Sequence, residues 1–207
     1  MVVRLPEPSL VEIVRRARIL VVDDQDFPYS VLFKSEGYNV TKWKDVTKLT
    51  EIEQGNYDII LLDLKGIGKK VSIDEGLGVL RHIKNQRPSQ IVVAYSNSDW
   101  PLQYQPFFDL ADKVLPKSAD YVDFKRIVDD LLQEHFSVGF HLARLDDHME
   151  QAGLNTWRGK RAVRKAVSSR DTASLSHFLS AKGVDTEAAQ VILGLAQVAI
   201  GVVQIWT

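Results

Sequence analysis

Short apolar runs alternate with amphipathic patterns between Arg18 and Phe136. The runs are rich in β-branched residues and predict strands at Ile19–Val22, Val40–Lys42, Ile59–Leu62, Ile91–Tyr95 and Val114–Leu115. Apolar positions at helical spacing predict helices at Tyr29–Glu36, Val46–Gln54, Glu75–Lys84 and Tyr121–Phe136. Strands that alternate with helices are typical of a doubly wound parallel sheet, so we predict an α/β fold for this part of the chain.

Only helical patterns follow Gly139. They predict helices at Phe140–Ala152, Thr156–Ser169, Ala173–Ala181 and Thr186–Trp206. The predicted helix stops are Gly153 and Gly183, and the predicted N-caps are Asn155, Asp171 and Asp185. We therefore divide the chain into an N-terminal extension at 1–17, an α/β domain at 18–136 and a smaller all-α domain at 137–207.

Composition describes a globular protein, because 45% of the 207 residues are hydrophobic and 26% are charged. The formal net charge of −1 shows no overall preference for nucleic acid or for an anionic membrane, so such a partner would need a local patch. The chain has no cysteine, which excludes disulfides, zinc–thiolate sites and thiol catalysis. Its first residues lack the layout of a signal peptide, so we expect a cytoplasmic protein.

Acidic residues stand where the first and third predicted strands end: Asp23 and Asp24 after the first, and Asp63 after the third. A carboxylate at the end of a buried strand is energetically costly unless it is used. In doubly wound sheets, ligands bind outside the carboxyl ends of the strands, and Ser96 and Lys117 also fall at such ends. Carboxylates, a hydroxyl and a lysine at one edge suit a divalent cation and phosphoryl transfer to a carboxylate.

The chain resembles the receiver domain of two-component response regulators over 18–136. The matching segments are Ile19-Leu-Val-Val-Asp-Asp24, Asp58-Ile-Ile-Leu-Leu-Asp63-Leu, Asp74-Glu-Gly-Leu-Gly-Val-Leu80, Ile91-Val-Val-Ala-Tyr-Ser96 and Ala111-Asp-Lys-Val-Leu-Pro-Lys117. The resemblance implies a flavodoxin-like, five-stranded, doubly wound parallel sheet that is followed by an unrecognised helical extension.

The resemblance also implies the roles of individual residues. Asp63 looks like the phosphoacceptor, Ser96 like the switch hydroxyl and Lys117 like the lysine that pairs with the phosphoryl group. The implied Mg²⁺ site consists of Asp23, Asp24, Asp63 and the main-chain carbonyl of Lys65. The implied partner is a histidine kinase or phosphotransfer protein, and the implied role is that of a phosphorelay signalling protein rather than an enzyme.

Several positions depart from the pattern of receiver domains. Asn97 follows the switch hydroxyl where a small residue is usual, Val114 replaces the switch aromatic, and Ser118 replaces the proline after the lysine. Pro101 and Pro106 would shorten or break the fourth helix of the domain. We therefore expect the output to run through protein contacts of the helical tail rather than through the usual surface.

Other functions stay open at this point. A pseudo-receiver that keeps the fold as a scaffold or oligomerisation module, without phosphorylation, is the main alternative. A haloacid-dehalogenase-type phosphatase is disfavoured, because Lys65 stands where its second aspartate would be. The glycines at 65–70 lack the spacing of a nucleotide-binding loop, so we read them as a flexible loop.

A basic segment, 157–170, carries six basic residues and no acidic one, which leaves a DNA-binding regulator as a further alternative. No helix-turn-helix pattern supports it, so contact with an acidic protein, or plain solubility, is favoured. His141 and His148 lack the partners that a metal or phosphohistidine site needs, and we read them as packed or solvated.

The last segment, 188–207, carries no charge and is long enough to cross a bilayer as a helix. A polar and small-residue stripe recurs along it at spacings of three and four, formed by Glu187, Gln190, Gly194, Gln197, Gly201 and Gln204. This stripe favours a buried or homo-oligomer-forming helix at 186–206 over a membrane anchor.

Overall fold

The computed structural model describes residues 5–96 and 109–207. It divides into two compact units, one formed by Leu10–Leu132 and one formed by Gln133–Thr207 together with residues 5–9. The division lies inside helix α6, Tyr121–Phe136, and so close to the predicted boundary after residue 136. We call the two parts the α/β unit and the helical unit.

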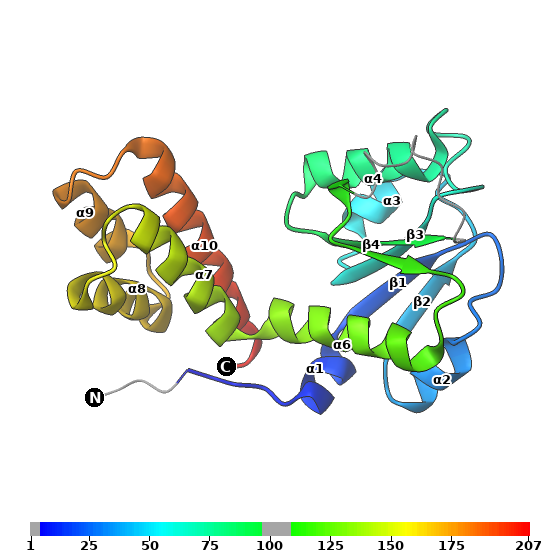
Figure 1. The fold of residues 1–207 in the computed structure, drawn as a ribbon, viewed down its shortest axis with the longest axis horizontal. Helices are drawn as coiled ribbons and strands as arrows, with labels where there is room; N and C mark the ends of the chain where they lie inside the picture. The colour runs from blue at the N-terminus through cyan, green and yellow to red at the C-terminus, as the bar shows by residue number, and fades with distance from the viewer. Residues whose placement is uncertain (1–4, 97–108) are drawn as a thin grey trace. The chain divides into compact units, whose positions relative to one another are not determined.

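The α/β unit is built on a five-stranded parallel sheet with the order β2-β1-β3-β4-β5 (Figure 1). The strands are β1 Arg18–Val22, β2 Asn39–Trp43, β3 Ile59–Asp63, β4 Ile91–Ser96 and β5 Lys113–Pro116. Every strand was predicted within two residues of its observed ends. This strand order is that of flavodoxin-like folds, so the predicted doubly wound sheet is confirmed.

Helices cover both faces of this sheet, with α3 and α4 on one side and α2 and α6 on the other (Figure 1). Their bounds are α2 Ser30–Ser35, α3 Leu49–Gln54 and α4 Glu75–Gln86, with α6 as given above. Alternate residues of the central strands, such as Leu20, Ile60 and Val92, share one apolar core with Ile52 of α3 and Leu80 of α4. Because both faces are covered, β1 and β3 are nearly continuous apolar runs, which is typical of central strands in a parallel sheet.

The opposite face of the sheet is packed with aromatic rings. Phe27, Phe33, Tyr95 and Phe124 form a cluster in which the ring centroids of neighbouring members lie 5.4–6.2 Å apart. These rings join α2 and α6 to β4, since they bury large surfaces and prefer tilted contacts. The aromatic cluster thus holds the last helix of the unit against the sheet.

A short first helix, α1 Leu10–Arg16, was not predicted. It buries Ile13 and Val14 and contacts β2, so part of the predicted N-terminal extension belongs to the α/β unit. Two turns are too short for apolar periodicity to distinguish a helix from a loop.

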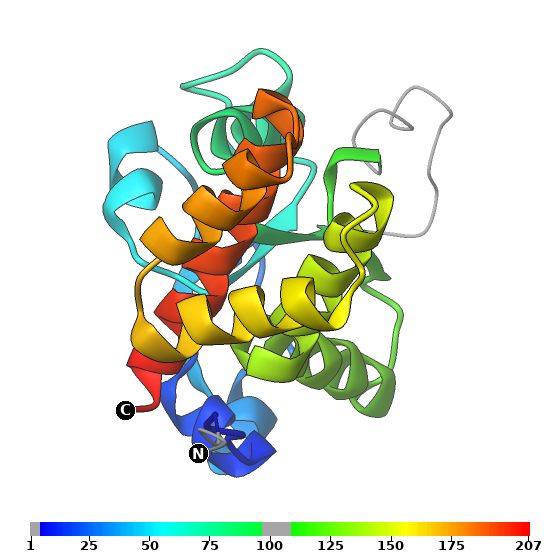
Figure 2. The ribbon, with the colours of Figure 1, turned by 90° about the vertical axis from the view of Figure 1, so that its left-hand side faces the viewer.

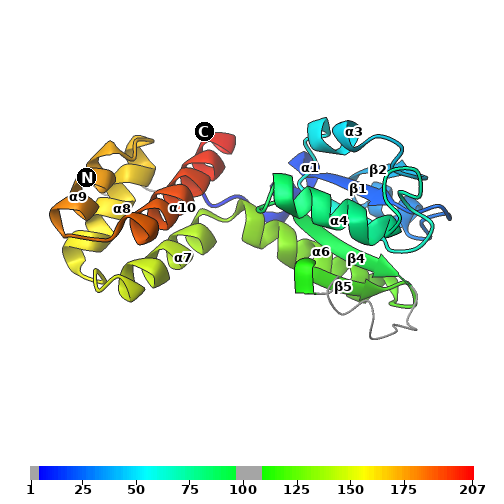
Figure 3. The same cartoon turned by 90° about the horizontal axis from the view of Figure 1, so that it is seen from above.

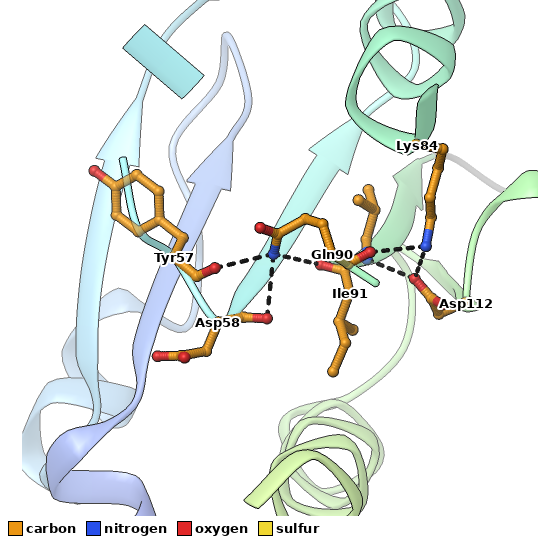
Figure 4. Close-up of polar contacts among 7 residues, drawn as sticks. Tyr57, Asp58, Lys84, Gln90, Ile91 and Asp112 are labelled. Carbon is orange, nitrogen blue, oxygen red and sulfur yellow. Dashed lines mark hydrogen bonds and ion pairs between the residues drawn. The ribbon is translucent and has the colours of Figure 1, made fainter. Parts of the chain in front are cut away.

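At the amino ends of the strands, Gln90 precedes β4, and its side chain is almost fully buried. Its amide nitrogen donates to the carbonyls of Tyr57 at 3.0 Å and Asp58 at 3.2 Å, before β3 (Figure 4). Beside it, Lys84 donates to the Gln90 carbonyl and, at 2.5 Å, to the Asp112 carboxylate. These bonds satisfy main-chain carbonyls that precede β3 and β4, and they tie α4 to the residue before β5.

The helical unit contains α7 Val138–Gln151, α8 Trp157–Ser169, α9 Ala173–Ala181 and α10 Thr186–Ile205. Helix α10 packs against the other three, most extensively along α7 (Figures 2 and 3). Their apolar faces form one core that includes Leu145, Val163, Leu175 and Ala196. The four predicted helices of the tail are confirmed, with ends shifted by at most two residues.

The helix caps of this unit are partly as predicted. Gly153 and Gly183 adopt positive φ after α7 and α9, and Asp185 caps α10 by accepting a hydrogen bond from the Ala188 amide. The prediction of Asn155 was wrong, because the Thr156 hydroxyl caps α8 instead, accepting from the Gly159 amide. Asn155 and Thr156 can both act as N-caps by residue type. The backbone conformation at the start of α8 selects Thr156, which has the extended φ and ψ of an N-cap.

Helix α10 is, among the described residues, the one helix long and apolar enough to cross a membrane by length and composition, a test that a core helix of a soluble protein also passes. It buries Ile192, Ala196, Ala199 and other residues in the core of the helical unit. The predicted polar stripe is on its uncovered side: Gly201 is half-buried and the other five members are exposed.

Candidate metal centre at the carboxyl edge of the sheet

Three carboxylates meet where β1 and β3 end. These strands are neighbours with Val22 opposite Leu62, so Asp23 and Asp24 emerge beside Asp63. Each of the three offers a carboxylate oxygen, and these oxygens lie within 4.8 Å of one another. Asp23 and Asp63 are 1% and 4% exposed, whereas Asp24 is open to solvent.

Lys117, which follows β5, supplies the balancing charge. Its Nζ atom lies 2.7 Å from Oδ2 of Asp63 and 2.9 Å from Oδ2 of Asp23. The ammonium group also lies 5.1 Å from the centre of the Tyr95 ring, which adds a cation–π contact. One lysine thus bridges the two buried carboxylates of the predicted site.

Burial and pairing act in opposite directions on these groups. Burial raises the pKa of the Asp63 carboxyl above its ordinary value, although the hydrogen bond from Lys117 and its charge work to lower it. Burial lowers the pKa of Lys117, but the hydrogen bonds to Asp23 and Asp63 outweigh it, so the pKa of Lys117 is raised. Lys117 is therefore held in its charged form against two carboxylates.

Main-chain and side-chain donors fix the carboxylates in place. The Gln25 amide donates to Oδ1 of Asp23 at 2.8 Å, and the Lys65 amide donates to Oδ1 of Asp63 at 3.3 Å. Lys42 donates to the main-chain carbonyl of Asp23 at 2.9 Å. Such bonds hold the side chains in one orientation, which a metal site requires of its ligands.

Two glycines allow other segments to approach the site closely. Gly66 has a φ of +84°, and a Cβ there would lie 2.7 Å from Oδ2 of Asp24. A Cβ at Gly76 would lie 2.3 Å from the carbonyl oxygen of Asp63, so the start of α4 can touch the end of β3 only with glycine at this position. The loop at 65–74 is also anchored, because Ile67 is fully buried and the Gly68 amide donates to Asp45 at 2.6 Å.

Glu75 is a site neighbour that the sequence analysis did not single out. Its carboxylate accepts a hydrogen bond from the Gly66 amide at 2.6 Å, and its φ is +51°, which is strained for a residue with a Cβ. Tyr95 and Gly76 were also missed as neighbours of the site. The only sequence signal for Tyr95 is that it precedes Ser96. No local sequence pattern identifies Glu75 or Gly76 as a site neighbour, because their contacts depend on how α4 meets β3.

The other predicted site residues are placed less fully. Ser96 ends β4, opposite Pro116 of β5, and its side chain lies outside the described part of the structure. Lys65 directly follows Leu64, and the role of its carbonyl as a ligand stays a prediction. Asn97 and the prolines at 101 and 106 lie outside the described residues.

The two departures at β5 do fall within the described residues. Val114 is 38% exposed on β5, and Ser118 is exposed after Lys117. Neither side chain therefore blocks the pairing of Lys117 with the buried carboxylates.

The donor set fits a hard divalent cation. Mg²⁺ prefers carboxylate oxygens at about 2.1 Å in octahedral geometry, and it commonly keeps several waters on the remaining positions. Three carboxylates with oxygens within 4.8 Å of one another, one of them open to solvent, match that preference. His141, by contrast, is buried within α7, where its Nε2 atom lies 2.9 Å from the His135 carbonyl, as expected for a packed histidine.

No protein-family model and no curated protein matches the chain.

Solved structures of receiver domains do match it in fold. The response regulator TrrA of Thermotoga maritima, in complex with Mg²⁺-BeF, is 26% identical, covers 56% of this chain and 98% of its own, and has a TM-score of 0.45. The receiver domain of NtrX from Brucella abortus is 24% identical, with the same coverages and a TM-score of 0.47. A CheY-like receiver domain protein from Methanospirillum hungatei is 24% identical, covers 57% of this chain and 94% of its own, and has a TM-score of 0.46. Over a little more than half of its length, the chain is thus similar in structure to the receiver domains of response regulators.

Proposed function

We propose that the chain is a response-regulator-like signalling protein in which Asp63 accepts a phosphoryl group, with Mg²⁺, from a histidine kinase or phosphotransfer protein. The observation that carries this proposal is the convergence of Asp23, Asp24 and Asp63, with Lys117 bridging the two buried members. Buried charges destabilise a fold unless they are paired, so a cluster of three carboxylates is better explained by a functional role than by the packing of the core.

Each side chain of the site has a distinct task in this reaction. The Asp63 carboxylate attacks phosphorus, the phosphorus–nitrogen bond to the partner's histidine breaks, and an acyl phosphate forms on Asp63. Asp23, Asp24 and the Lys65 carbonyl would hold Mg²⁺ together with Asp63, and the ion would neutralise phosphoryl oxygens when bound. Lys117, 2.7 Å from Asp63, is within reach of a phosphoryl oxygen on that residue.

The α/β unit also presents an apolar surface for a protein partner. Val31 on α2 is 78% exposed and Val122 on α6 is 72% exposed. Tyr29 lies two residues before Val31 and Tyr121 lies directly before Val122, and the centroids of the two tyrosine rings lie 5.6 Å apart. Exposed apolar side chains at the starts of adjoining helices favour docking of another protein, here the phosphodonor. We place the output in protein contacts of the helical unit.

Intact mass spectrometry tests the proposal after incubation of the full chain with acetyl phosphate and Mg²⁺. We expect an adduct of one phosphoryl group that is absent in Asp63→Asn and without Mg²⁺. Asp58→Asn is the matched control, because Asp58 lies just before the other end of the same strand and should keep the adduct. No adduct in the wild-type chain, or the same adduct in Asp63→Asn, would refute the proposal.

A phosphorylation-independent scaffold is the second candidate, and one observation favours it. Lys117 already pairs with both Asp23 and Asp63, so part of the charge of the buried carboxylates is offset without a metal ion. Titration of the chain with Mg²⁺ by calorimetry separates the two candidates. Binding that is lost in Asp24→Asn supports the phosphoacceptor, whereas no binding at millimolar Mg²⁺ supports the scaffold.

A further inference from the structure

Helix α8 of the helical unit has two different faces. Gly159, Val163, Ala166 and Val167 are buried against the core of the unit. The opposite face carries the basic residues of the segment 157–170, which has six of them and no acidic residue. This face exposes Arg158, Arg161, Arg164 and Lys165.

These four cations have no acidic partners within the described part of the chain, since none of them takes part in an ion pair there. Like charges one turn apart on a helix repel one another, and solvated helix faces usually mix both signs. A face of one sign along about two turns is therefore complementary to a polyanion.

An exposed aromatic ring lies on the same face. Trp157 is 70% exposed, which is unusual for the largest apolar side chain, and the guanidinium of Arg161 lies 5.3 Å from the centre of its ring. The arginine lies over the indole, and the high exposure of the residue leaves much of the ring accessible. An aromatic ring among cations matches a ligand with both phosphates and flat apolar groups.

Alternative anionic partners fit this face less well. Insertion into a membrane needs an apolar helix face, but the apolar face of α8 is buried in the core. Duplex DNA keeps its bases stacked inside, so Trp157 would have nothing to stack on. An acidic protein offers carboxylates but no series of flat rings. Unpaired bases on a phosphate backbone use both the charges and the indole.

We propose that the exposed face of α8 binds single-stranded nucleic acid, with Arg158, Arg161, Arg164 and Lys165 on phosphates and Trp157 stacked on an unpaired base. The proposal does not depend on phosphoryl chemistry at Asp63, so the wild-type chain and Asp63→Asn should bind alike.

Fluorescence anisotropy of the full chain with labelled oligothymidylate, and separately with oligouridylate, tests the proposal over a series of salt concentrations. We expect binding that weakens with salt, and weaker binding to a duplex of the same length. The triple variant Arg158→Gln, Arg161→Gln, Lys165→Gln should flatten the slope of log affinity against log salt by about 0.7 for each lost phosphate contact. Trp157→Ala should weaken binding of the single strand about tenfold without changing the slope.

The matched control removes the same charge elsewhere: Lys34→Gln, Lys44→Gln, Lys69→Gln changes three exposed lysines of the α/β unit and should bind like wild type. Glutamine is a good helix former at the exposed positions of α8, and circular dichroism checks that each variant is folded. The proposal is overturned if neither single strand binds, if the control loses as much affinity as the α8 variant, or if Trp157→Ala binds normally. It is also overturned if polyglutamate or phosphatidylserine vesicles bind more tightly than both single strands.

Discussion

Lys117 shows how one residue sets the character of the candidate site. Its ammonium group lies within 2.9 Å of both buried carboxylates, Asp23 and Asp63, and so ties the ends of β1 and β3 together through one cation. Its raised pKa keeps it charged throughout the neutral range. Under the function proposed above, Lys117 would pair with the carboxylates in one state and with the phosphoryl group in the other, and such a change of partner could transmit the difference between the two states.

His141 predicts a pH dependence for the helical unit. Burial lowers its pKa below the ordinary value of 6.5, the His135 carbonyl works to raise it, and the charge of Arg144 lowers it further. Its Nδ1 atom is buried without a hydrogen-bond partner, so protonation would leave an unpaired donor there. Because the unfolded state binds the proton more readily, the stabilisation is complete above about pH 6.5 and is lost as the pH falls below it.

Hydrogen exchange of the α7 amides measures this effect. We expect protection to fall between pH 7 and pH 5 in the wild-type chain, after correction for the intrinsic exchange rate, and to fall less in His141→Gln. His177→Gln, at an exposed histidine of α9, should behave like wild type. Equal pH dependence in all three proteins would contradict the assignment.

Elements are positioned by individual residues at both edges of the sheet. At the carboxyl edge, Gly76 lets α4 begin directly against the end of β3. At the other edge, Gln90 is buried and donates to two carbonyls ahead of β3 (Figure 4).

Helix and strand patterns were predictable because apolar periodicity is local. Helix α1 was missed because two turns are too short to show a clear apolar periodicity.

Gln90→Ala should destabilise the α/β unit by about 1–3 kcal/mol, because the carbonyls of Tyr57 and Asp58 lose a donor where water has little access. Urea denaturation followed by far-ultraviolet circular dichroism measures the change. Gln86→Ala, at the exposed end of α4, is the control and should change the free energy of unfolding by less than about 0.5 kcal/mol. A loss for Gln90→Ala no larger than for the control would show that its hydrogen bonds are dispensable.

The whole molecule consists of two units with separate cores, and the candidate site belongs entirely to one of them. A ligand stabilises the cooperative unit that binds it and leaves an independent unit unchanged. The two units should therefore respond differently to Mg²⁺.

Saturating Mg²⁺ at about one hundred times its dissociation constant should stabilise the α/β unit by about 2.7 kcal/mol. Hydrogen exchange resolved by peptide measures this: amides of β1 and β3 should gain protection, and amides of α8 and α9 should not. Asp24→Asn should abolish this gain in protection. Equal gains in both units would show that the units unfold together. No gain in either unit would show that the site does not bind Mg²⁺.

By itself, the sequence determined the types and order of the described elements apart from α1, the two-part organisation, and the carboxylates and lysine at the strand ends, because strand alternation, helical spacing and strand-end chemistry are local patterns. Tertiary structure alone decided which of those residues meet. Lys117 pairs with Asp63 across 54 positions of sequence, Glu75 reaches Gly66, and Thr156 rather than Asn155 caps α8. It also decided that Trp157 is exposed among the cations of α8. These contacts depend on how packed elements approach one another, which no local pattern specifies.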